Sequence, residues 1–80
     1  MHGNFTVYSK EGCPYCTKVE EVLQLAGLRH VVYVLERDFD RKSFYDQFGP
    51  GSTFPQVVRD ATNIGGCMET VQYLKEKKLV

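Results

Sequence analysis

The chain lacks an excess of either charge, a long apolar stretch and any tryptophan. Its 80 residues contain ten Lys and Arg side chains and ten Asp and Glu side chains, so the formal net charge is zero. Nucleic-acid binding depends on clustered cations that neutralise phosphates, and this composition offers no such excess. No apolar run approaches the roughly 20 residues that a membrane-spanning helix needs. The sequence therefore predicts neither a nucleic-acid-binding protein nor a membrane protein.

The N-terminus also lacks the features of a secretion signal. Met1-His2-Gly3-Asn4 has neither the cationic region nor the apolar stretch that a signal peptide carries. We expect a single domain over residues 1–80, because a chain this short supports one thin core. We also expect a monomer in the cytoplasm, or in the cytoplasm of a host cell if a phage encodes it.

The cysteine count is low and odd, with Cys13, Cys16 and Cys67 only. A secreted disulfide scaffold of this size would carry an even number, so redox chemistry, metal binding or packing are the remaining uses. Cys13 and Cys16 are spaced C-x-x-C, which is half of a structural zinc site. The other candidate ligands, Cys67, His2 and His30, form no second pair. The sequence therefore predicts no metal site.

Hydrophobic patterning predicts a small α/β fold. We expect strands over residues 5–8, 30–35, 56–59 and 62–64, and helices over residues 14–26, 41–48 and 67–77. The order β-α-β-α-β-β-α predicts a four-stranded mixed sheet flanked by three helices, with a parallel first βαβ unit and a final hairpin. The run over residues 30–35 is nearly continuous in apolar side chains, which is typical of a strand covered on both faces.

Several residues indicate where the helices end and which sides face inward. Gly27 suits the left-handed position after the first helix, and Asp40 suits the cap of the second. Side chains spaced three or four apart are expected to face the interior: Phe44 and Phe48 in the second helix, and Met68, Val71 and Leu74 in the third.

Cys13 stands where a strand ends and a helix begins. Unpaired N–H groups and the positive end of the helix dipole stabilise a thiolate there, so its pKa is expected to fall below the ~8.5 of a free cysteine. Lys10 would add to this effect, whereas Glu11 would oppose it if its carboxylate turned inward. Cys16, one turn later, is less exposed but within disulfide reach. The pair can cycle: Cys13 attacks a disulfide, and Cys16 resolves the mixed disulfide that forms.

Two further segments carry weaker signals. In Thr53-Phe54-Pro55-Gln56, a proline enters a strand, which places it at a sheet edge or beside a site. A cis bond before Pro55 would present the Phe54 backbone to the neighbourhood of Cys13, whereas a trans bond would make it an ordinary strand start. In Ile64-Gly65-Gly66-Cys67, two glycines allow a ligand to approach a helix N-terminus, although a plain turn has the same composition.

In this order the three motifs resemble the glutaredoxin family. Cys-Pro-Tyr-Cys is the family's dithiol motif, Thr-Phe-Pro resembles its Thr-Val-Pro segment, and Gly-Gly-Cys resembles its glutathione-binding turn. The resemblance runs from Phe5 to about Leu79. The absence of tryptophan and of a Cys-Gly-Pro-Cys motif argues against thioredoxin proper. The resemblance implies a thioredoxin fold with Pro55 in cis, and glutathione as co-substrate.

The resemblance also implies roles for individual residues. Cys13 is the nucleophile and Cys16 resolves protein disulfides. Lys10 faces the glycine carboxylate of glutathione, the Phe54 backbone pairs with its cysteine moiety, and the turn at Gly66 holds its γ-glutamyl carboxylate. The full set implied to bind glutathione is Lys10, Tyr15, Thr53, Phe54, Pro55, Gly66, Cys67, Met68 and Glu69.

This chain departs from the family pattern at two places. Many members have a cation where this chain has Gly51, and Gln47 is a candidate to replace it. After Gly-Gly-Cys the family often has a small polar residue and Asp, where this chain has Met68 and Glu69. Glu69 could still reach the glutamyl ammonium with its longer side chain. Cys67 is common in the family, and we expect it to be a packing thiol.

The resulting expectation is a glutathione-dependent thiol–disulfide oxidoreductase, which serves electron transport and cell redox homeostasis by reducing protein disulfides and glutathione mixed disulfides. One alternative is a dedicated electron donor to a partner such as ribonucleotide reductase, recharged by thioredoxin reductase. Another is a protein that binds a [2Fe–2S] cluster between two protomers through Cys13 and two glutathiones. Pro14 disfavours the cluster, since cluster-binding relatives usually carry a different residue there.

Overall fold

The computed structural model describes residues 4–80. The expectation that no secretion signal is present, and the weak candidacy of His2 as a zinc ligand, concern Met1, His2 and Gly3, which lie outside the described residues.

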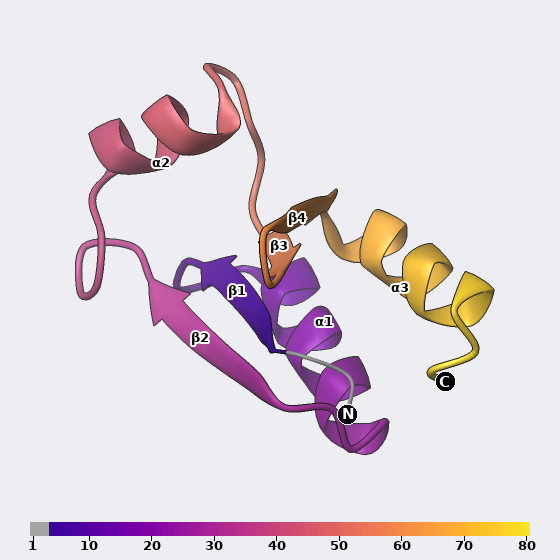
Figure 1. The fold of residues 1–80 in the computed structure, drawn as a ribbon. Coiled ribbons are helices and arrows are strands. Elements are labelled where there is room, and N and C mark those ends of the chain that lie inside the picture. The colour runs from indigo at the N-terminus through magenta and orange to yellow at the C-terminus, as the bar shows by residue number, and fades with distance from the viewer. Residues whose placement is uncertain (1–3) are drawn as a thin grey trace.

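Four strands and three helices alternate along the chain (Figure 1). Their order is β1 (Phe5–Ser9), α1 (Pro14–Leu25), β2 (His30–Val34), α2 (Arg41–Phe48), β3 (Gln56–Arg59), β4 (Thr62–Gly65) and α3 (Cys67–Glu76). In the sheet the strands lie in the order β2-β1-β3-β4. β1 runs parallel to β2 and antiparallel to β3, and β3 and β4 form an antiparallel hairpin. The predicted order and the mixed four-stranded sheet are therefore confirmed.

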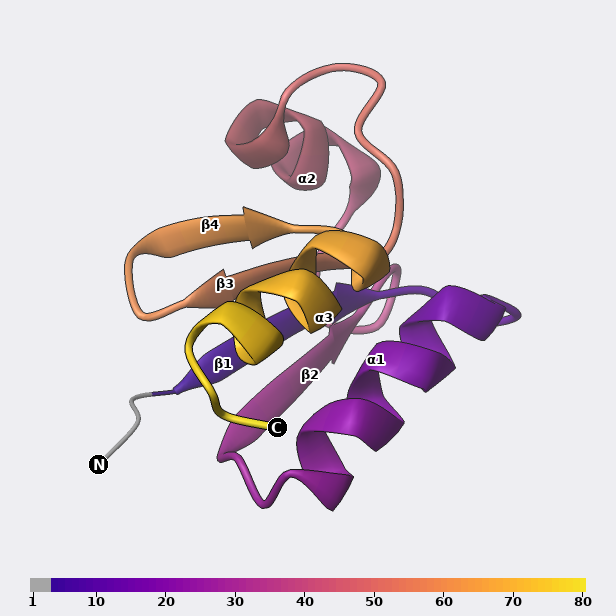
Figure 2. The same ribbon diagram turned by 90° about the vertical axis from the view of Figure 1, so that its right-hand side faces the viewer.

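α1 and α3 lie over one face of the sheet (Figure 2). The buried core between these helices and the sheet is mostly aliphatic and includes the ring of Phe5. Side chains alternate along β1, so that Phe5 and Val7 point into this core and are fully buried. The remaining core members come from both helices, from the loop after α1 and from β3: Val19, Leu23, Leu28, Val57, Cys67 and Leu74. This layer fixes the two helices against the sheet.

α2 lies on the opposite side of the sheet (Figure 2), and aromatic rings pack between the two. Tyr8 points to this side from β1 and contacts the rings of Phe39 and Phe48 at centroid distances of 5.3 and 5.0 Å. Phe44 is buried in α2 and packs against Phe39 at 5.9 Å. The inward orientation predicted for Phe44 is therefore confirmed.

The helix ends follow the local signals in the sequence. Gly27 has a φ of +69°, and Leu28 N–H donates to the Leu23 carbonyl at 3.0 Å, which closes α1 with a left-handed residue. At α2, the Asp40 carboxylate accepts a hydrogen bond from Ser43 N–H at 2.8 Å. Both predicted helix ends are confirmed.

The prediction that residues 30–35 form a strand covered on both faces is wrong. β2 is an edge strand, and Val31 and Tyr33 are 44% and 41% exposed. The eight residues of α2 span only about 12 Å, and the ring contacts on its side of the sheet reach Tyr8 and Tyr33 near the strand ends. A continuous apolar run can therefore occur in a strand with one incompletely covered face.

The inward orientation predicted for Met68 is also wrong, because this side chain is 76% exposed. The buried residues of α3 are Cys67, Thr70 and Leu74, so the inward orientation predicted for Leu74 is confirmed, while Val71 is half-buried. Thr70 is buried because its hydroxyl donates to the Gly66 carbonyl at 2.7 Å, which satisfies the polar group without water. A polar residue, Thr70, thus occupies an inner position that the apolar pattern did not assign to it.

Candidate functional site

Cys13 is the N-cap residue of α1. β1 ends at Ser9, the loop turns at Gly12 with a φ of +69°, and Pro14 begins the helix. The Cys13 sulfur accepts a hydrogen bond from Cys16 N–H at 3.3 Å. The sulfur therefore occupies the place of the usual capping oxygen, where a negative charge is favoured by the helix dipole.

Cys13 and Cys16 form a disulfide, with their Cα atoms 5.2 Å apart. Cys13 is partly exposed, whereas Cys16 is 1% exposed beneath the first turn of the helix. The predicted division between an accessible and a covered cysteine is confirmed. Only Cys13 is positioned for attack on a disulfide that arrives from solvent.

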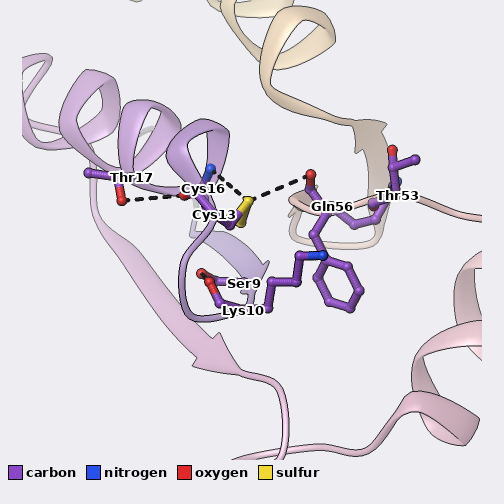
Figure 3. Close-up of a disulfide and its surroundings, with 8 residues drawn as sticks. Ser9, Lys10, Cys13, Cys16, Thr17, Thr53 and Gln56 are labelled. Atoms are coloured by element: carbon purple, nitrogen blue, oxygen red, sulfur yellow. Dashed lines mark hydrogen bonds between the residues drawn. A yellow bond between two sulfur atoms is a disulfide. The ribbon is translucent and has the colours of Figure 1, made fainter.

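The segment Thr53–Gln56 lies across from the two cysteines (Figure 3). The Phe54–Pro55 peptide bond is cis, as the resemblance implied. The Phe54 carbonyl oxygen lies 3.8 Å from the Cys13 sulfur. In the reduced protein this carbonyl can accept a hydrogen bond from the Cys13 thiol, whereas Cys16 N–H stabilises the thiolate. The sulfur thus lies between two backbone groups of opposite polarity.

A groove of about 220 Å³ lies beside the disulfide. It is lined by Tyr15, Thr53, Phe54, Pro55, Gly66, Cys67, Met68 and Glu69. These are eight of the nine residues that the sequence assigned to glutathione, drawn from α1, from the segment before β3 and from the start of α3. The structure therefore brings this set together, while their binding of glutathione stays a prediction.

The ninth residue, Lys10, lies outside this lining. Its ammonium nitrogen is 5.3 Å from the centre of the Phe54 ring, a cation–π distance. It also lines a neighbouring depression of about 520 Å³ together with Glu11, Arg37 and Arg41. Figure 3 shows its side chain extending from the end of β1 toward the Thr53–Gln56 segment. Lys10 is therefore linked to the groove through the Phe54 ring.

The turn before α3 closes the other end of the groove. Gly66 N–H donates to a Glu69 carboxylate oxygen at 3.0 Å. A Cβ added at Gly66 would come within 3.0 Å of that oxygen and 3.5 Å of the Pro55 carbonyl. A side chain at residue 66 would therefore displace the Glu69 carboxylate from this hydrogen bond and would stand in ordinary contact with the Pro55 backbone. The turn and the Thr53–Pro55 segment, two of the predicted binding segments, line the same groove.

Cys67 is buried in the aliphatic core and forms no disulfide. Burial raises the pKa of its thiol, and nearby Glu69 acts in the same direction, while Lys18 opposes it. A thiol that holds its proton is a weak nucleophile. The structure is consistent with the expected packing role.

An aromatic stack supports the Phe54 segment from behind. The rings of Phe44 and Phe54 are nearly parallel, with centroids 4.1 Å apart and an interplanar angle of 9°. Sequence analysis placed Phe44 inward but did not find this contact, because it depends on where α2 lies against the sheet. The sequence feature that could have indicated this contact is Phe54 itself, which stands where the family has Val in its Thr-Val-Pro segment.

Two expectations about ions and membranes can be compared with residues 4–80. Within that range no group of three or more His, Cys, Asp and Glu side chains is gathered as a metal site requires. No helix in the same range is long and apolar enough to cross a bilayer. Gln47 and Gly51, the positions considered for a second carboxylate anchor, both lie outside the groove lining.

Comparison with known proteins identifies similar chains. The family model for glutaredoxin matches residues 5–64. Glutaredoxin-C2 of Arabidopsis thaliana is 34% identical over 77 residues, which cover 92% of this chain and 69% of the plant protein. Glutaredoxin 3 of Escherichia coli is 30% identical over 64 residues, which cover 80% of this chain and 77% of the bacterial protein.

Two solved structures show the same fold at comparable similarity. Glutaredoxin 1 from Francisella tularensis, complexed with cacodylate, has a TM-score of 0.78 at 26% identity and covers 95% of each chain. A buckwheat glutaredoxin–glutathione complex has a TM-score of 0.78 at 26% identity over 94% of this chain and 71% of that one. The four-stranded sheet and three helices are those of the thioredoxin fold.

Proposed function

This chain belongs to the glutaredoxin family and is a thiol–disulfide oxidoreductase, and from this premise we propose that it is a glutathione-dependent reductase. Its substrates are protein disulfides and mixed disulfides between proteins and glutathione. The observation that carries the proposal is the position of the Cys13 sulfur, which caps α1 and lies 3.8 Å from the Phe54 carbonyl at the groove.

The chemistry uses the two cysteines in sequence. The Cys13 thiolate attacks one sulfur of the substrate disulfide, forms a mixed disulfide and releases the other sulfur as a thiolate, which takes up a proton. The Cys16 thiolate then attacks Cys13, releases the second substrate thiol and forms the internal disulfide. Two electrons pass from the dithiol to the substrate. Two molecules of glutathione return the enzyme to the dithiol state and leave as glutathione disulfide.

In the proposed orientation, glutathione lies along the groove beside Cys13. Its cysteine moiety pairs with the Phe54 backbone as a short added strand, which places its sulfur at Cys13. The glycine carboxylate extends toward Lys10, whose ammonium lies over the Phe54 ring. The γ-glutamyl carboxylate meets the N-terminus of α3 at Gly66, where the helix dipole favours an anion and where it replaces the Glu69 carboxylate as acceptor of the Gly66 N–H. The buckwheat relative, solved as a glutathione complex, supports glutathione as the ligand.

Mass spectrometry of a trapped adduct tests the proposal. Cys16→Ser, combined with Cys67→Ala, is treated with oxidised glutathione. The Cys13 thiolate should displace one glutathione thiol and retain the other half as a single stable adduct. Cys13→Ser with Cys67→Ala is the matched control, because it retains one cysteine in the same motif. An adduct on the control, or none on either variant, would contradict the proposal.

A dedicated electron donor to one partner, such as ribonucleotide reductase, is the second candidate. The observation that favours it is the position of Gln47 and Gly51 outside the groove lining, which leaves Lys10 as the cation assigned to the glycine carboxylate. The two candidates differ in their source of electrons. Turnover with glutathione and glutathione reductase supports the first, whereas turnover with thioredoxin reductase alone supports the second.

We further propose that the protein acts as a monomer in the cytoplasm, because the dithiol form needs a reducing compartment. Sedimentation of the reduced protein tests the first part, and the redox state of Cys13 in intact cells tests the second.

A further inference from the structure

A second groove continues the one beside Cys13. It lies between β4 and α3, has a volume of about 550 Å³, and is lined by Thr62, Asn63, Ile64, Met68, Glu69, Gln72, Tyr73 and Glu76. Met68 and Glu69 line both grooves. The two depressions therefore meet at the first turn of α3, and a chain bound in the first can extend into the second.

The second groove has the features of a peptide-binding surface. β4 is an outer strand of the sheet, so the backbone edge it turns away from β3 is open to an added strand. Thr62 and Asn63 are exposed along it. Met68 is 76% exposed at the junction of the grooves, and its flexible thioether can pack against apolar side chains of different shapes.

We propose that this groove binds the polypeptide of a disulfide-bearing protein substrate, on the N-terminal side of its reactive cysteine. The inference rests on the proposed function, in which a cysteine moiety lies against Phe54 and the group before it lies at the Gly66 turn. A protein cysteine that binds in the same place and direction sends its preceding residues past that turn, over Met68 and along α3. Glutathione is too short to follow this path.

The charges of the groove define the preferred segment. Its charged lining residues are Glu69 and Glu76. Glu69 already accepts a hydrogen bond from Gly66 N–H. Glu76 accepts a hydrogen bond from the side-chain amide of Gln72 at 3.1 Å, and because this amide is neutral, the contact does not compensate the negative charge of Glu76. Arg59 and Lys77 are both engaged with Tyr73, through its hydroxyl and its ring respectively. A cationic side chain in the substrate therefore has its best partner at Glu76.

The spacing of Met68 and Glu76 along α3 indicates which substrate residues would contact them. Met68 and Glu76 are two helical turns apart on one side of α3, a distance of about 12 Å. An extended chain covers this distance in about four residues. The favoured substrate thus has an apolar residue shortly before its cysteine and a Lys or Arg about four residues earlier.

Single-turnover reduction of two peptide disulfides tests the proposal. Each probe is a symmetric disulfide of a peptide that contains one cysteine. The shorter peptide is Leu-Gly-Cys, and the longer peptide is Lys-Lys-Ala-Ala-Ala-Leu-Gly-Cys. The pre-reduced dithiol protein attacks one sulfur, releases one peptide thiol, and then releases the second as Cys13 and Cys16 become oxidised. The longer probe should react roughly threefold to fivefold faster with the wild type.

Two charge reversals on exposed positions provide the comparison. Glu76→Lys should remove the preference for the longer probe and leave the shorter probe unchanged. Glu21→Lys, on the exposed side of α1, makes the same charge change away from the groove and should retain the preference. Equal wild-type rates with both probes, or equal loss in both variants, would overturn the proposal.

The outcome is separable from that of the proposed function. Single-turnover reduction uses no glutathione, so a preference for the longer probe can be observed whether or not glutathione supports turnover. Turnover with glutathione but no preference for the longer probe would remove the second groove as a substrate site and leave the proposed function intact.

Discussion

The two faces of the sheet differ in their side chains, and we assign stability mainly to one face and support of the site to the other. Beneath α1 and α3 the core is mostly aliphatic, with Val7, Leu23 and Leu74 fully buried beside the ring of Phe5. On the α2 side the contacts are between aromatic rings, and Tyr8, Phe48 and Phe54 remain partly exposed. The side chains on the first, mostly aliphatic face pack α1 and α3 against the sheet, whereas the aromatic rings on the second face contact Phe54, which lies beside Cys13.

Phe54 makes this connection. Its ring stacks on Phe44 and lies under the Lys10 ammonium, while its carbonyl faces the Cys13 sulfur. Damage to the aliphatic face should therefore reduce stability with little effect on the activity of each folded molecule. Damage to the aromatic face should reduce activity beyond what the loss of stability explains.

Leu23→Ala is expected to have the largest effect. It removes a fully buried side chain from the aliphatic core and should lower the free energy of unfolding by about 2–5 kcal/mol. Leu25→Ala in the same helix is the control, since that side chain is 89% exposed and should change stability by about 0.5 kcal/mol or less. Urea denaturation measures both, and equal losses would contradict the assignment of the core.

Phe44→Leu should damage activity more than stability. Without the stacked ring, the Phe54 carbonyl loses its support opposite Cys13, and small displacements at a reacting centre are costly. We expect roughly a tenfold loss of kcat/KM on a glutathionylated peptide per folded molecule. Steady-state kinetics, corrected for the folded fraction, measures the effect.

Phe48→Leu is the matched control for that variant. Phe48 lies in the same helix and contacts Tyr8 and Phe44. If the contact with Phe54 is what matters, Phe54→Leu should reproduce the loss, the double variant should add little to it, and Phe48→Leu should retain most activity. Equal loss in Phe44→Leu and Phe48→Leu would show that general packing of α2 is responsible.

Lys10→Gln should reduce activity less than Phe44→Leu does. It removes the cation that lies over Phe54 and that we assign to the glycine carboxylate of glutathione. We expect a rise of about twofold to fivefold in the KM for glutathione, with kcat largely retained. Lys75→Gln, an exposed change in α3, is the control. An unchanged KM in Lys10→Gln would remove Lys10 from the binding set.

The smallest expected effect is a pH dependence of stability that comes from the buried thiol of Cys67, under α1 and α3. Burial raises the pKa of its thiol, so the folded protein holds this proton more tightly than the unfolded chain. Its contribution to stability is complete below the unfolded pKa of about 8.5 and is lost as the pH rises above it. Urea midpoints at neutral and alkaline pH should fall more in the reduced wild type than in reduced Cys67→Ala. An identical fall would show that Cys67 does not titrate differently on folding.

The sequence predicted the features that depend on local signals. Cys13 before Pro14, the left-handed Gly27 and the Asp40 cap each act within one helical turn, so the element order and the position of the cysteine pair followed from them. Motif resemblance supplied the residues that the fold later gathers around the groove.

Other features depended on contacts between distant segments. The exposure of Tyr33 follows from the edge position of β2 and the short reach of α2, which no local pattern contains. Met68 is exposed, whereas Thr70 takes an inner position with its hydroxyl bonded to the Gly66 carbonyl, and the apolar pattern contained neither outcome. The stack of Phe44 on Phe54 forms only once the second helix is placed against the sheet.

Comparison of Cys16→Ser with Cys13→Ser on two substrates tests the central claim most directly. Cys16→Ser should retain removal of glutathione from a glutathionylated peptide, because a second glutathione can release the first from Cys13. The same variant should lose most reduction of a protein disulfide, which needs internal attack by Cys16, and Cys13→Ser should lose both activities. If Cys16→Ser is inactive on the glutathionylated peptide, the account of Cys13 as a nucleophile that works with glutathione is contradicted.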